Sequence, residues 1–247
     1  MVDQFSPVPG EIVLEIGPGH GALTGPLLEA GAQVVAVEVD RALAESLRRR
    51  FGDHPGLRLV EADILDCDMA ALVAPGPARV LANLPYAISG EILARLLARS
   101  DLLSGITVML QRELVNRITA TPGGRVYGSL SMLAQYFCLP RLLMQLSPRS
   151  FTPPPLVSSS VVALPFRTTR ELSRAQELEY PGFIRLLFAH RRRTLLNNLK
   201  AATLDNPIDV LRRAGVDPGR RPETLTREEG IALFRASRAQ SAGAFVV

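Results

Sequence analysis

The stretch Ile12-Val13-Leu14-Glu15-Ile16-Gly17-Pro18-Gly19-His20-Gly21 decides the fold that we predict for this chain of 247 residues. Its first half is a short, largely apolar run typical of a buried strand, and its second half is a glycine turn. A helical pattern follows, from Ala22 to Ala30. Glycines at such a turn let backbone amides approach a ligand at the start of the helix. The stretch therefore predicts a strand–turn–helix unit that binds a nucleotide-containing ligand.

Short strand patterns alternate with helix patterns over the first half of the chain. After the strand at residues 12–16, further strands are predicted at residues 33–38, 57–60, 79–82 and 106–110, with helices at residues 22–30, 42–51 and 92–97. This alternation predicts an α/β fold with a mostly parallel sheet covered by helices. Because the carboxyl ends of such strands border the ligand crevice, we expect the glycine turn, Glu38, Asp63 and Asn83 to converge on one site.

The rest of the chain predicts the end of the sheet and then a separate helical region. Two helices, at residues 112–119 and 129–137, precede two more strands at residues 141–146 and 160–164. Beyond a polar linker the pattern is helical throughout, at residues 183–188, 195–199, 210–214 and 228–236. We therefore predict a ligand-binding α/β domain at residues 1–170 and a small all-helical domain at residues 171–247.

Positive charge is concentrated in the helical region. The chain has 28 Lys+Arg against 24 Asp+Glu, a net charge of +4. Residues 1–169 carry 14 arginines against 15 acidic residues, whereas residues 170–247 carry 13 arginines and Lys200 against 9 acidic residues. Net charges of −1 and +5 favour an anionic partner for the helical region, nucleic acid rather than membrane. A solvated basic face is the alternative interpretation.

The composition excludes several classes of protein. The longest uncharged stretch, residues 150–166, holds four prolines and cannot form the apolar helix of roughly 20 residues that a bilayer requires. The first residues lack the basic and apolar regions of a secretory signal, so we expect a cytoplasmic protein with no membrane partner. Cys67 and Cys138 stand 71 positions apart with no histidine cluster nearby, which argues against a disulfide framework and against a bound metal.

Two carboxylates at successive strand ends suit a nucleoside. Glu38 can accept hydrogen bonds from both hydroxyls of a ribose, and Asp63, beside the apolar Ile64, can accept one from the exocyclic amine of an adenine. The glycine turn alone leaves a second ligand open. Gly17-x-Gly19-x-x-Ala22, with Glu38 21 positions after Gly17, also fits a dinucleotide motif and hence an NAD-linked oxidoreductase.

The turn Asn83-Leu84-Pro85-Tyr86 favours methyl transfer over hydride transfer. Its proline fixes the backbone, so that the Asn83 amide oxygen and the Leu84 carbonyl oxygen point into the crevice as two acceptors. An exocyclic amine that donates both N–H bonds to them frees its lone pair from the ring to attack a sulfonium methyl group. The Tyr86 ring is placed to stack on an aromatic substrate. Hydride transfer has no use for this arrangement.

The motifs of the chain form an ordered series of eight segments. They are Val13-Leu14-Glu15-Ile16-Gly17-Pro18-Gly19-His20-Gly21-Ala22-Leu23-Thr24, Val37-Glu38-Val39-Asp40, Ala62-Asp63, Asn83-Leu84-Pro85-Tyr86, Met109-Leu110-Gln111-Arg112-Glu113, Tyr127-Gly128-Ser129-Leu130-Ser131, Phe151-Thr152-Pro153-Pro154-Pro155 and His190-Arg191-Arg192-Arg193-Thr194-Leu195. This series, which spans nearly the whole chain, resembles the bacterial small-subunit ribosomal RNA adenine dimethyltransferases. The resemblance implies a Rossmann-like methyltransferase domain that binds S-adenosylmethionine at residues 1–170 and a helical RNA-binding domain at residues 171–247. It also implies N6,N6-dimethylation of two adjacent adenosines near the 3′ end of small-subunit (16S) rRNA, with a role in ribosome assembly.

The resemblance assigns a role to each site residue. Glu38 is expected on the cofactor ribose and Asp63 on its adenine amine, Asn83 and Leu84 on the target amine, and Tyr86 and Phe151 on the two faces of the target base. The expected catalytic residues are Asn83, Leu84, Pro85, Tyr86 and Phe151. The expected cofactor-binding residues are Gly17, Pro18, Gly19, Glu38, Val39, Asp63, Ile64 and Asn83. The expected contacts to RNA phosphates are Arg191, Arg192, Arg193 and Lys200, which carry charge without reading sequence.

The sequence departs from the family's pattern at its start. Members carry an N-terminal segment with a Gly-Gln-(Asn/His)-Phe-Leu element that covers the cofactor, whereas only residues 1–11 precede the first predicted strand here. We therefore expect this cover to be absent and the cofactor to bind more weakly. Two further functions stay open, a large-subunit rRNA adenine methyltransferase of the macrolide-resistance type and a non-catalytic ribosome-assembly or RNA-binding factor. We expect small-subunit rRNA or its precursor particle as the partner, and a monomer.

Overall fold

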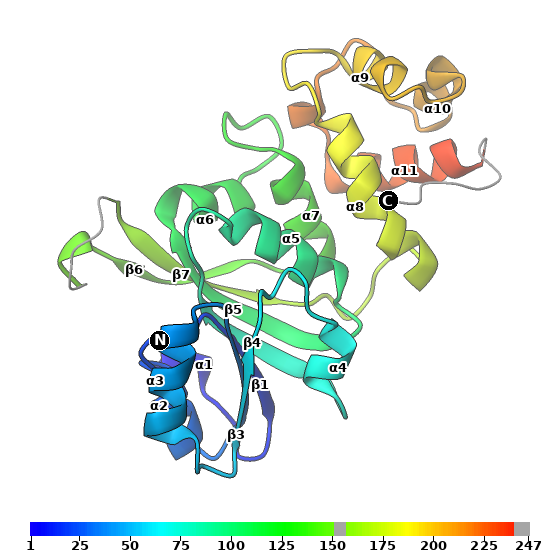
Figure 1. Ribbon diagram of the computed structural model, residues 1–247. Coiled ribbons are helices and arrows are strands. Elements are labelled where there is room, and N and C mark those ends of the chain that lie inside the picture. The colour runs from blue at the N-terminus through cyan, green and yellow to red at the C-terminus, as the bar shows by residue number, and fades with distance from the viewer. Residues whose placement is uncertain (151–156, 240–247) are drawn as a thin grey trace. The chain divides into compact units, whose positions relative to one another are not determined.

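The computed structural model describes residues 1–150 and 157–239 (Figure 1). The chain divides into two compact units. The first unit comprises Met1–Val115 and Leu139–Phe166, and the second comprises Asn116–Cys138 together with the described residues from Arg167 onward. No helix within these described residues is long and apolar enough to cross a membrane.

A seven-stranded mixed sheet forms the centre of the first unit. Its strands are β1 (Ile12–Ile16), β2 (Gln33–Glu38), β3 (Leu57–Glu61), β4 (Ala78–Asn83), β5 (Leu103–Gln111), β6 (Arg141–Leu146) and β7 (Ser159–Pro165). They are arranged in the order β3-β2-β1-β4-β5-β7-β6. The first five strands are parallel, and β7 pairs antiparallel with both β5 and β6. The near-continuous apolar runs of β1, β2 and β4 fit strands that are buried on both faces.

Helices cover the two faces of this sheet. They are α1 (Val2–Phe5), α2 (Thr24–Glu29), α3 (Arg41–Phe51), α4 (Met69–Val73) and α5 (Ser89–Ala98). Phe5 of α1 and Leu27 of α2 pack in one core cluster with Val13 and Val34 of the sheet, and Phe51 of α3 packs against that cluster. Figure 1 shows α4 and α5 on the opposite side of the sheet from α2 and α3, as right-handed crossover connections require.

The second unit is built from helices around an aromatic core. Helix α6 (Arg112–Ile118) carries the chain into it, and the remaining elements are α7 (Ser129–Phe137), α8 (Arg174–Leu187), α9 (Leu195–Ala201), α10 (Pro207–Arg213), the short 3-10 helix η2 (Pro222–Thr224) and α11 (Arg227–Arg238). The ring of Tyr180 lies 4.8 Å from that of Tyr136 and 5.3 Å from that of Phe234, measured between centroids. All three side chains are fully buried.

The α/β fold with a helical C-terminal part agrees with the sequence prediction, but the predicted domain limits of 1–170 and 171–247 differ from the observed units. Residues 116–138 belong to the second unit instead of the first. The reason is side-chain packing, because the Tyr136 hydroxyl donates to Glu177 Oε1 at 3.1 Å and its ring lies against Tyr180. Helix α8 also begins nine residues earlier than the predicted start at residue 183, where Ser173 forms a capping box with Gln176.

Candidate active site

The carboxyl ends of the parallel strands bring the predicted site residues to one edge of the sheet. Glu38 is in register with Glu61, and Asn83 with Met109. The amide of Gly17 donates to the Val37 carbonyl oxygen at 3.0 Å, which joins the end of β1 to the end of β2. A Cβ atom on Gly17 would lie 3.9 Å from the Asn83 carbonyl oxygen, so the glycine turn and the end of β4 are neighbours.

The glycine turn leaves its backbone open to a ligand. Gly17 and Gly19 have φ angles of 64° and 58°, in the left-handed region that favours glycine. A Cβ atom on Gly19 would meet nothing within 4 Å, so there is open space beside this part of the backbone. Pro18, between them, is buried. The turn therefore exposes main chain at the edge of the sheet where the predicted cofactor site lies.

Glu38 is held in place by two backbone amides. Gly19 N donates to Oε2 and Asp40 N donates to Oε1, each at 3.0 Å. The side chain is only 5% exposed, so it is fixed by these contacts. Each carboxylate oxygen keeps a second lone pair, which leaves two acceptors for a pair of hydroxyls. Val39, the next residue, is 68% exposed and presents an apolar surface at the same strand end.

Glu15 is a second buried carboxyl group, two residues before the glycine turn. Thr24 Oγ1 donates to its Oε2 at 2.7 Å, while its Oε1 is buried and has no hydrogen-bond partner in the described part of the chain. Burial raises the pKa of Glu15 to about 7, and the nearby Glu38 charge adds to this effect, while the Thr24 hydrogen bond opposes it. A cationic or hydrogen-bond-donating partner would stabilise the ionised form of this carboxyl group.

Asp63 and Ile64 follow β3 at the same edge. Asp63 is half-buried, and its Oδ1 accepts a hydrogen bond from Leu65 N at 2.9 Å. Its other carboxylate oxygen remains available to a donor. Ile64 is 5% exposed, so most of its side chain packs inside the unit. Between Asp63 and the exposed Val39, the edge combines hydrogen-bond acceptors with apolar surface, as a nucleoside base requires.

The turn Asn83-Leu84-Pro85-Tyr86 is anchored at several points. Leu84 is buried, and its amide donates to the Met109 carbonyl oxygen at 3.3 Å. Asn83 and Pro85 are exposed. Tyr86 is half-buried, and its hydroxyl shares a hydrogen bond of 2.7 Å with Ser159 Oγ. The turn thus places an exposed amide and an aromatic ring at the end of β4.

Phe151, the expected second stacking partner, lies outside the described residues. Sequence reasoning missed the contact of Ser159 with Tyr86, because the strand predicted at residues 160–164 begins after Ser159. The signal available was a run of three serines before an apolar strand, which marks a strand start but not a contact to Tyr86. Across residues 1–150 and 157–239, no three His, Cys, Asp or Glu side chains gather in a way that could hold a metal ion.

In the second unit, the predicted RNA-binding residues all lie on the surface. Arg193 and Lys200 line one shallow pocket of about 400 Å³ together with Asn197 and Ala201. Arg191 and Arg192 are also exposed, and the Arg191 guanidinium donates to the Arg125 carbonyl oxygen. The residues thus share one exposed segment, with at least two of them facing the same pocket.

We call residues 188–194, which join α8 to α9, the basic loop. The side chain of Asn198, which is 1% exposed, forms hydrogen bonds to the backbone of this loop. Its Oδ1 accepts from His190 N at 3.0 Å, and its Nδ2 donates to the carbonyl oxygens of His190 at 3.1 Å and Thr194 at 3.2 Å. Three hydrogen bonds from one buried amide fix the backbone that carries Arg191, Arg192 and Arg193.

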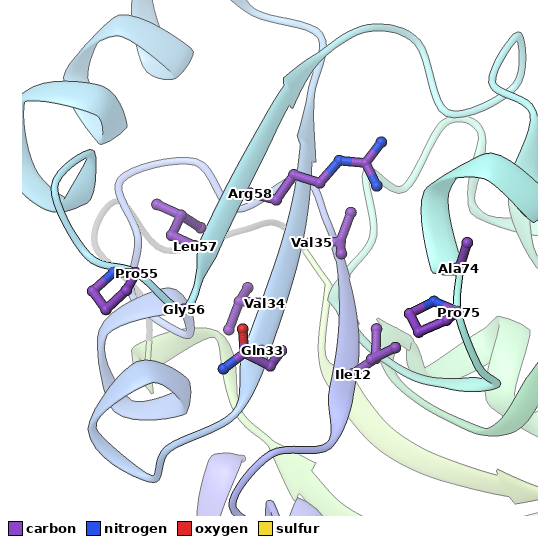
Figure 2. A pocket seen from close by; sticks show the side chains of 10 residues that line it. All are labelled: Ile12, Gln33, Val34, Val35, Pro55, Gly56, Leu57, Arg58, Ala74 and Pro75. Atoms are coloured by element: carbon purple, nitrogen blue, oxygen red, sulfur yellow. The ribbon is translucent and has the colours of Figure 1, made fainter.

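A separate cavity of about 230 Å³ lies at the opposite, amino ends of β1, β2 and β3 (Figure 2). Its walls are mainly apolar, and Figure 2 shows the Ile12 side chain next to Pro75. The Arg58 guanidinium is already engaged, donating to the carbonyl oxygens of Ala71 and Leu72 at 3.2 Å and 3.3 Å. The cavity brings together none of the predicted site residues, so the candidate site is the carboxyl edge of the sheet.

The fold is that of the Rossmann-like methyltransferase class, as the likeness to two solved structures shows. The structure resembles a dimethyladenosine transferase from Plasmodium falciparum, with a TM-score of 0.77, 24% identity and coverage of 94% of this chain and 91% of that one. It also resembles the 23S rRNA methyltransferase ErmE, with a TM-score of 0.67, 25% identity and coverage of 95% and 94%. The predicted fold class is therefore confirmed.

Residues 1–237 match the family model described as "Ribosomal RNA adenine dimethylase", and the chain belongs to that family. Two relatives, both called "Ribosomal RNA small subunit methyltransferase A", show the same. The protein from Acinetobacter baylyi is 41% identical over 94% of this chain and 84% of its own length. The protein from Geobacter sulfurreducens is 42% identical over 92% of this chain and 84% of its own length. This membership confirms the enzyme class expected from the sequence and decides against an NAD-linked oxidoreductase.

Proposed function

We propose that this chain transfers methyl groups from S-adenosylmethionine to N6 of two adjacent adenosines near the 3′ end of small-subunit rRNA. One observation carries the proposal: Glu38, Asp63 and the turn from Asn83 to Tyr86 meet at one edge of the sheet. The relatives at about 40% identity are named for the small subunit, whereas ErmE, named for 23S rRNA, is only 25% identical. The small-subunit substrate is therefore favoured over the large-subunit one.

The residues at this edge fit S-adenosylmethionine. Glu15 Oε1, buried and unpaired among the described residues, suits the cofactor's ammonium group. Glu38 keeps two free lone pairs for the ribose hydroxyls, and Asp63 keeps an oxygen for the adenine amine. Open space beside Gly19 admits the cofactor close to the backbone. When bound, S-adenosylmethionine supplies an electrophilic methyl group on a sulfonium.

The turn after β4 prepares the nucleophile. The exposed Asn83 amide oxygen and the Leu84 carbonyl oxygen accept the two N–H bonds of the target amine, so that its lone pair is freed from conjugation with the ring. With S-adenosylmethionine bound, Asn83 and Leu84 would hold this nitrogen in place to accept the methyl group, and the proton that the nitrogen loses would pass to water. Holding the two reacting atoms at near-attack distance can lower the activation barrier by about 7–11 kcal/mol in well-oriented systems.

The target base must leave its stack to reach this turn. Stacking on the Tyr86 ring stabilises an unstacked base by about 1–3 kcal/mol, in the range measured for aromatic platforms. Arg191, Arg192, Arg193 and Lys200 of the second unit supply positive charge for RNA phosphates. We also propose that the chain acts in the cytoplasm, as a monomer, on rRNA or its precursor particle.

Primer extension tests this proposal directly. Small ribosomal subunits from a strain that lacks adenine dimethylation are incubated with the purified chain and radiolabelled S-adenosylmethionine. We expect incorporated methyl groups and strong extension stops at two adjacent adenosines near the 3′ end. Asn83→Ala should abolish both and, because Asn83 is also an expected cofactor contact, should weaken but not abolish cofactor binding in isothermal titration. Gln33→Ala, an exposed amide at the amino end of β2, is the matched control and should leave activity unchanged.

Each of two outcomes would contradict the proposal and favour a different function. Methyl groups incorporated into large-subunit RNA but not into small subunits would favour the macrolide-resistance type. Cofactor or RNA binding without any incorporation would favour a non-catalytic assembly factor. Stops of wild-type strength with Asn83→Ala would reject the role of Asn83 while leaving the reaction itself in place.

A further inference from the structure

The ring of Tyr86 is held at its hydroxyl end by a buried serine. Tyr86 Oη and Ser159 Oγ lie 2.7 Å apart and share a hydrogen bond. Ser159 is 0% exposed, whereas Tyr86 is half-buried. The bond therefore connects the exposed edge, where a substrate base would stack, to the interior of the sheet. A tyrosine hydroxyl that is partly buried usually finds a hydrogen-bond partner, and here that partner also fixes where the tip of the ring lies.

Ser159 itself sits on a rigid support. It is the first residue of β7, and its backbone is in register with Gln111 of β5 on one side and Leu146 of β6 on the other. The neighbouring Ser158 carbonyl oxygen accepts a hydrogen bond from Arg112 N at 3.0 Å. With strands on both sides, the sheet sets the position of the Ser159 Cα atom, and only one side-chain torsion remains for its hydroxyl.

The backbone of Tyr86 is restrained as well. Ser89, which is buried, donates from Oγ to the Tyr86 carbonyl oxygen at 3.1 Å. The Leu84 amide, two residues earlier, is bonded to the Met109 carbonyl oxygen of β5. The ring is thus fixed at its backbone end by two contacts and at its hydroxyl end by Ser159. A ring held at both ends keeps its direction and the position of its tip.

We propose that Ser159 is a positioning residue, which fixes where the tip of the Tyr86 ring lies and thereby places the stacked adenine amine against Asn83 and Leu84. The inference rests on the function proposed above and deepens it. Ser159 does not touch the substrate and acts only through the Tyr86 ring. A displacement of about 1 Å at a reacting centre can cost about 100-fold in rate. A ring whose tip can shift sideways therefore lowers turnover more than it lowers cofactor binding.

Three variants and one control test this role. Ser159→Ala and Tyr86→Phe remove the same hydrogen bond from its two ends, and the double variant completes the cycle. Ser160→Ala is the matched control, because Ser160 is equally buried, at 1% exposed, and its hydroxyl has no partner in the described part of the chain. The readouts are kcat and the KM for S-adenosylmethionine, measured on small ribosomal subunits.

We expect each single variant to lower kcat by about 3- to 10-fold, the range of one hydrogen bond, with the KM for the cofactor unchanged. The double variant should be no slower than either single variant, and Ser160→Ala should match the wild type. Wild-type kcat in Ser159→Ala, or two single effects that multiply in the double variant, would overturn the inference. If Ser159→Ala does not fold, Tyr86→Phe with wild-type kcat overturns it instead. An inactive wild type would overturn the proposed function itself, a result distinct from these.

Discussion

Glu15→Gln is the substitution that tests the electrostatics of the site most directly. It replaces a buried carboxyl group by a neutral amide of the same shape, and the amide oxygen can still accept the Thr24 hydrogen bond. Burial raises the pKa of Glu15 from 4.5 in the unfolded chain to about 7 in the folded chain. As the pH rises between these values, the unfolded chain releases this proton first. The folded state is therefore destabilised progressively from about pH 4.5 to about pH 7.

The size of this effect follows from the pKa difference. Between 4.5 and about 7, at about 1.4 kcal/mol per pKa unit, the penalty reaches about 3 kcal/mol above pH 7. Gln at this position has no such penalty, although its buried amide nitrogen lacks a partner and costs about 1 kcal/mol at every pH. The free energy of unfolding of Glu15→Gln relative to wild type should thus rise by about 3 kcal/mol between pH 4.5 and pH 8.

Urea unfolding followed by circular dichroism, at half-unit steps of pH and without cofactor, measures this difference. Glu29→Gln is the matched control, since Glu29 is an exposed glutamate on α2 in the same unit. Its curve should run parallel to that of the wild type. Parallel curves for Glu15→Gln as well would refute the reasoning, because they would show that Glu15 ionises in the folded chain as easily as in the unfolded one.

Three further substitutions probe packing and loop geometry. Arg79→Met should cost about 2 kcal/mol and speed amide exchange in α1, because Arg79 donates to carbonyl oxygens at the end of α1 and stacks 3.7 Å from the centroid of the Phe5 ring. Gly230→Ala should cost about 1–3 kcal/mol in urea unfolding, because its Cβ atom would lie 2.7 Å from Met132 Sδ. Asn198→Ala should loosen the basic loop and weaken RNA binding at fixed salt in filter-binding assays, with a loss of about 1–3 kcal/mol in stability.

Each of these three has a control in the same chain. Arg41→Met changes an exposed arginine and should leave amide exchange in α1 unaltered. Gly90→Ala places a Cβ atom in open space within helix α5 and should be neutral or stabilising. Asn197→Ala removes the exposed neighbour of Asn198 and should leave stability unchanged. A substitution that behaves like its control contradicts the contact assigned to it.

The strands and their shared edge could be predicted from the sequence because the information is local. Each parallel strand is a short apolar run followed by a turn or a polar residue, and the parallel arrangement alone brings Glu38, Asp63 and Asn83 to one edge. The helix predicted at residues 42–51 is local in the same sense, and α3 begins one residue earlier, after Asp40 accepts from two backbone amides.

The features that could not be predicted depend on contacts between distant segments. Ser159 and Tyr86 are 73 positions apart, and no periodicity in either segment indicates that their hydroxyls meet. The sequence pattern of residues 116–138 looks like a continuation of the α/β region. Contacts such as that of Tyr136 with Tyr180, which the pattern does not indicate, assign these residues to the second unit. The start of α8 was missed because its first turns are polar and contain Pro181, which normally argues against a helix interior.

The discontinuous second unit has a consequence for the order of folding during synthesis. Helix α7 is synthesised before β6 and β7, yet α8 and α11, which pack against it in the described part of the chain, are made after them. The aromatic side chains of α7 therefore lack these partners while the strands of the sheet are being completed. Such a surface is a target for chaperones, and a chain that terminates at residue 166 would expose it permanently and aggregate.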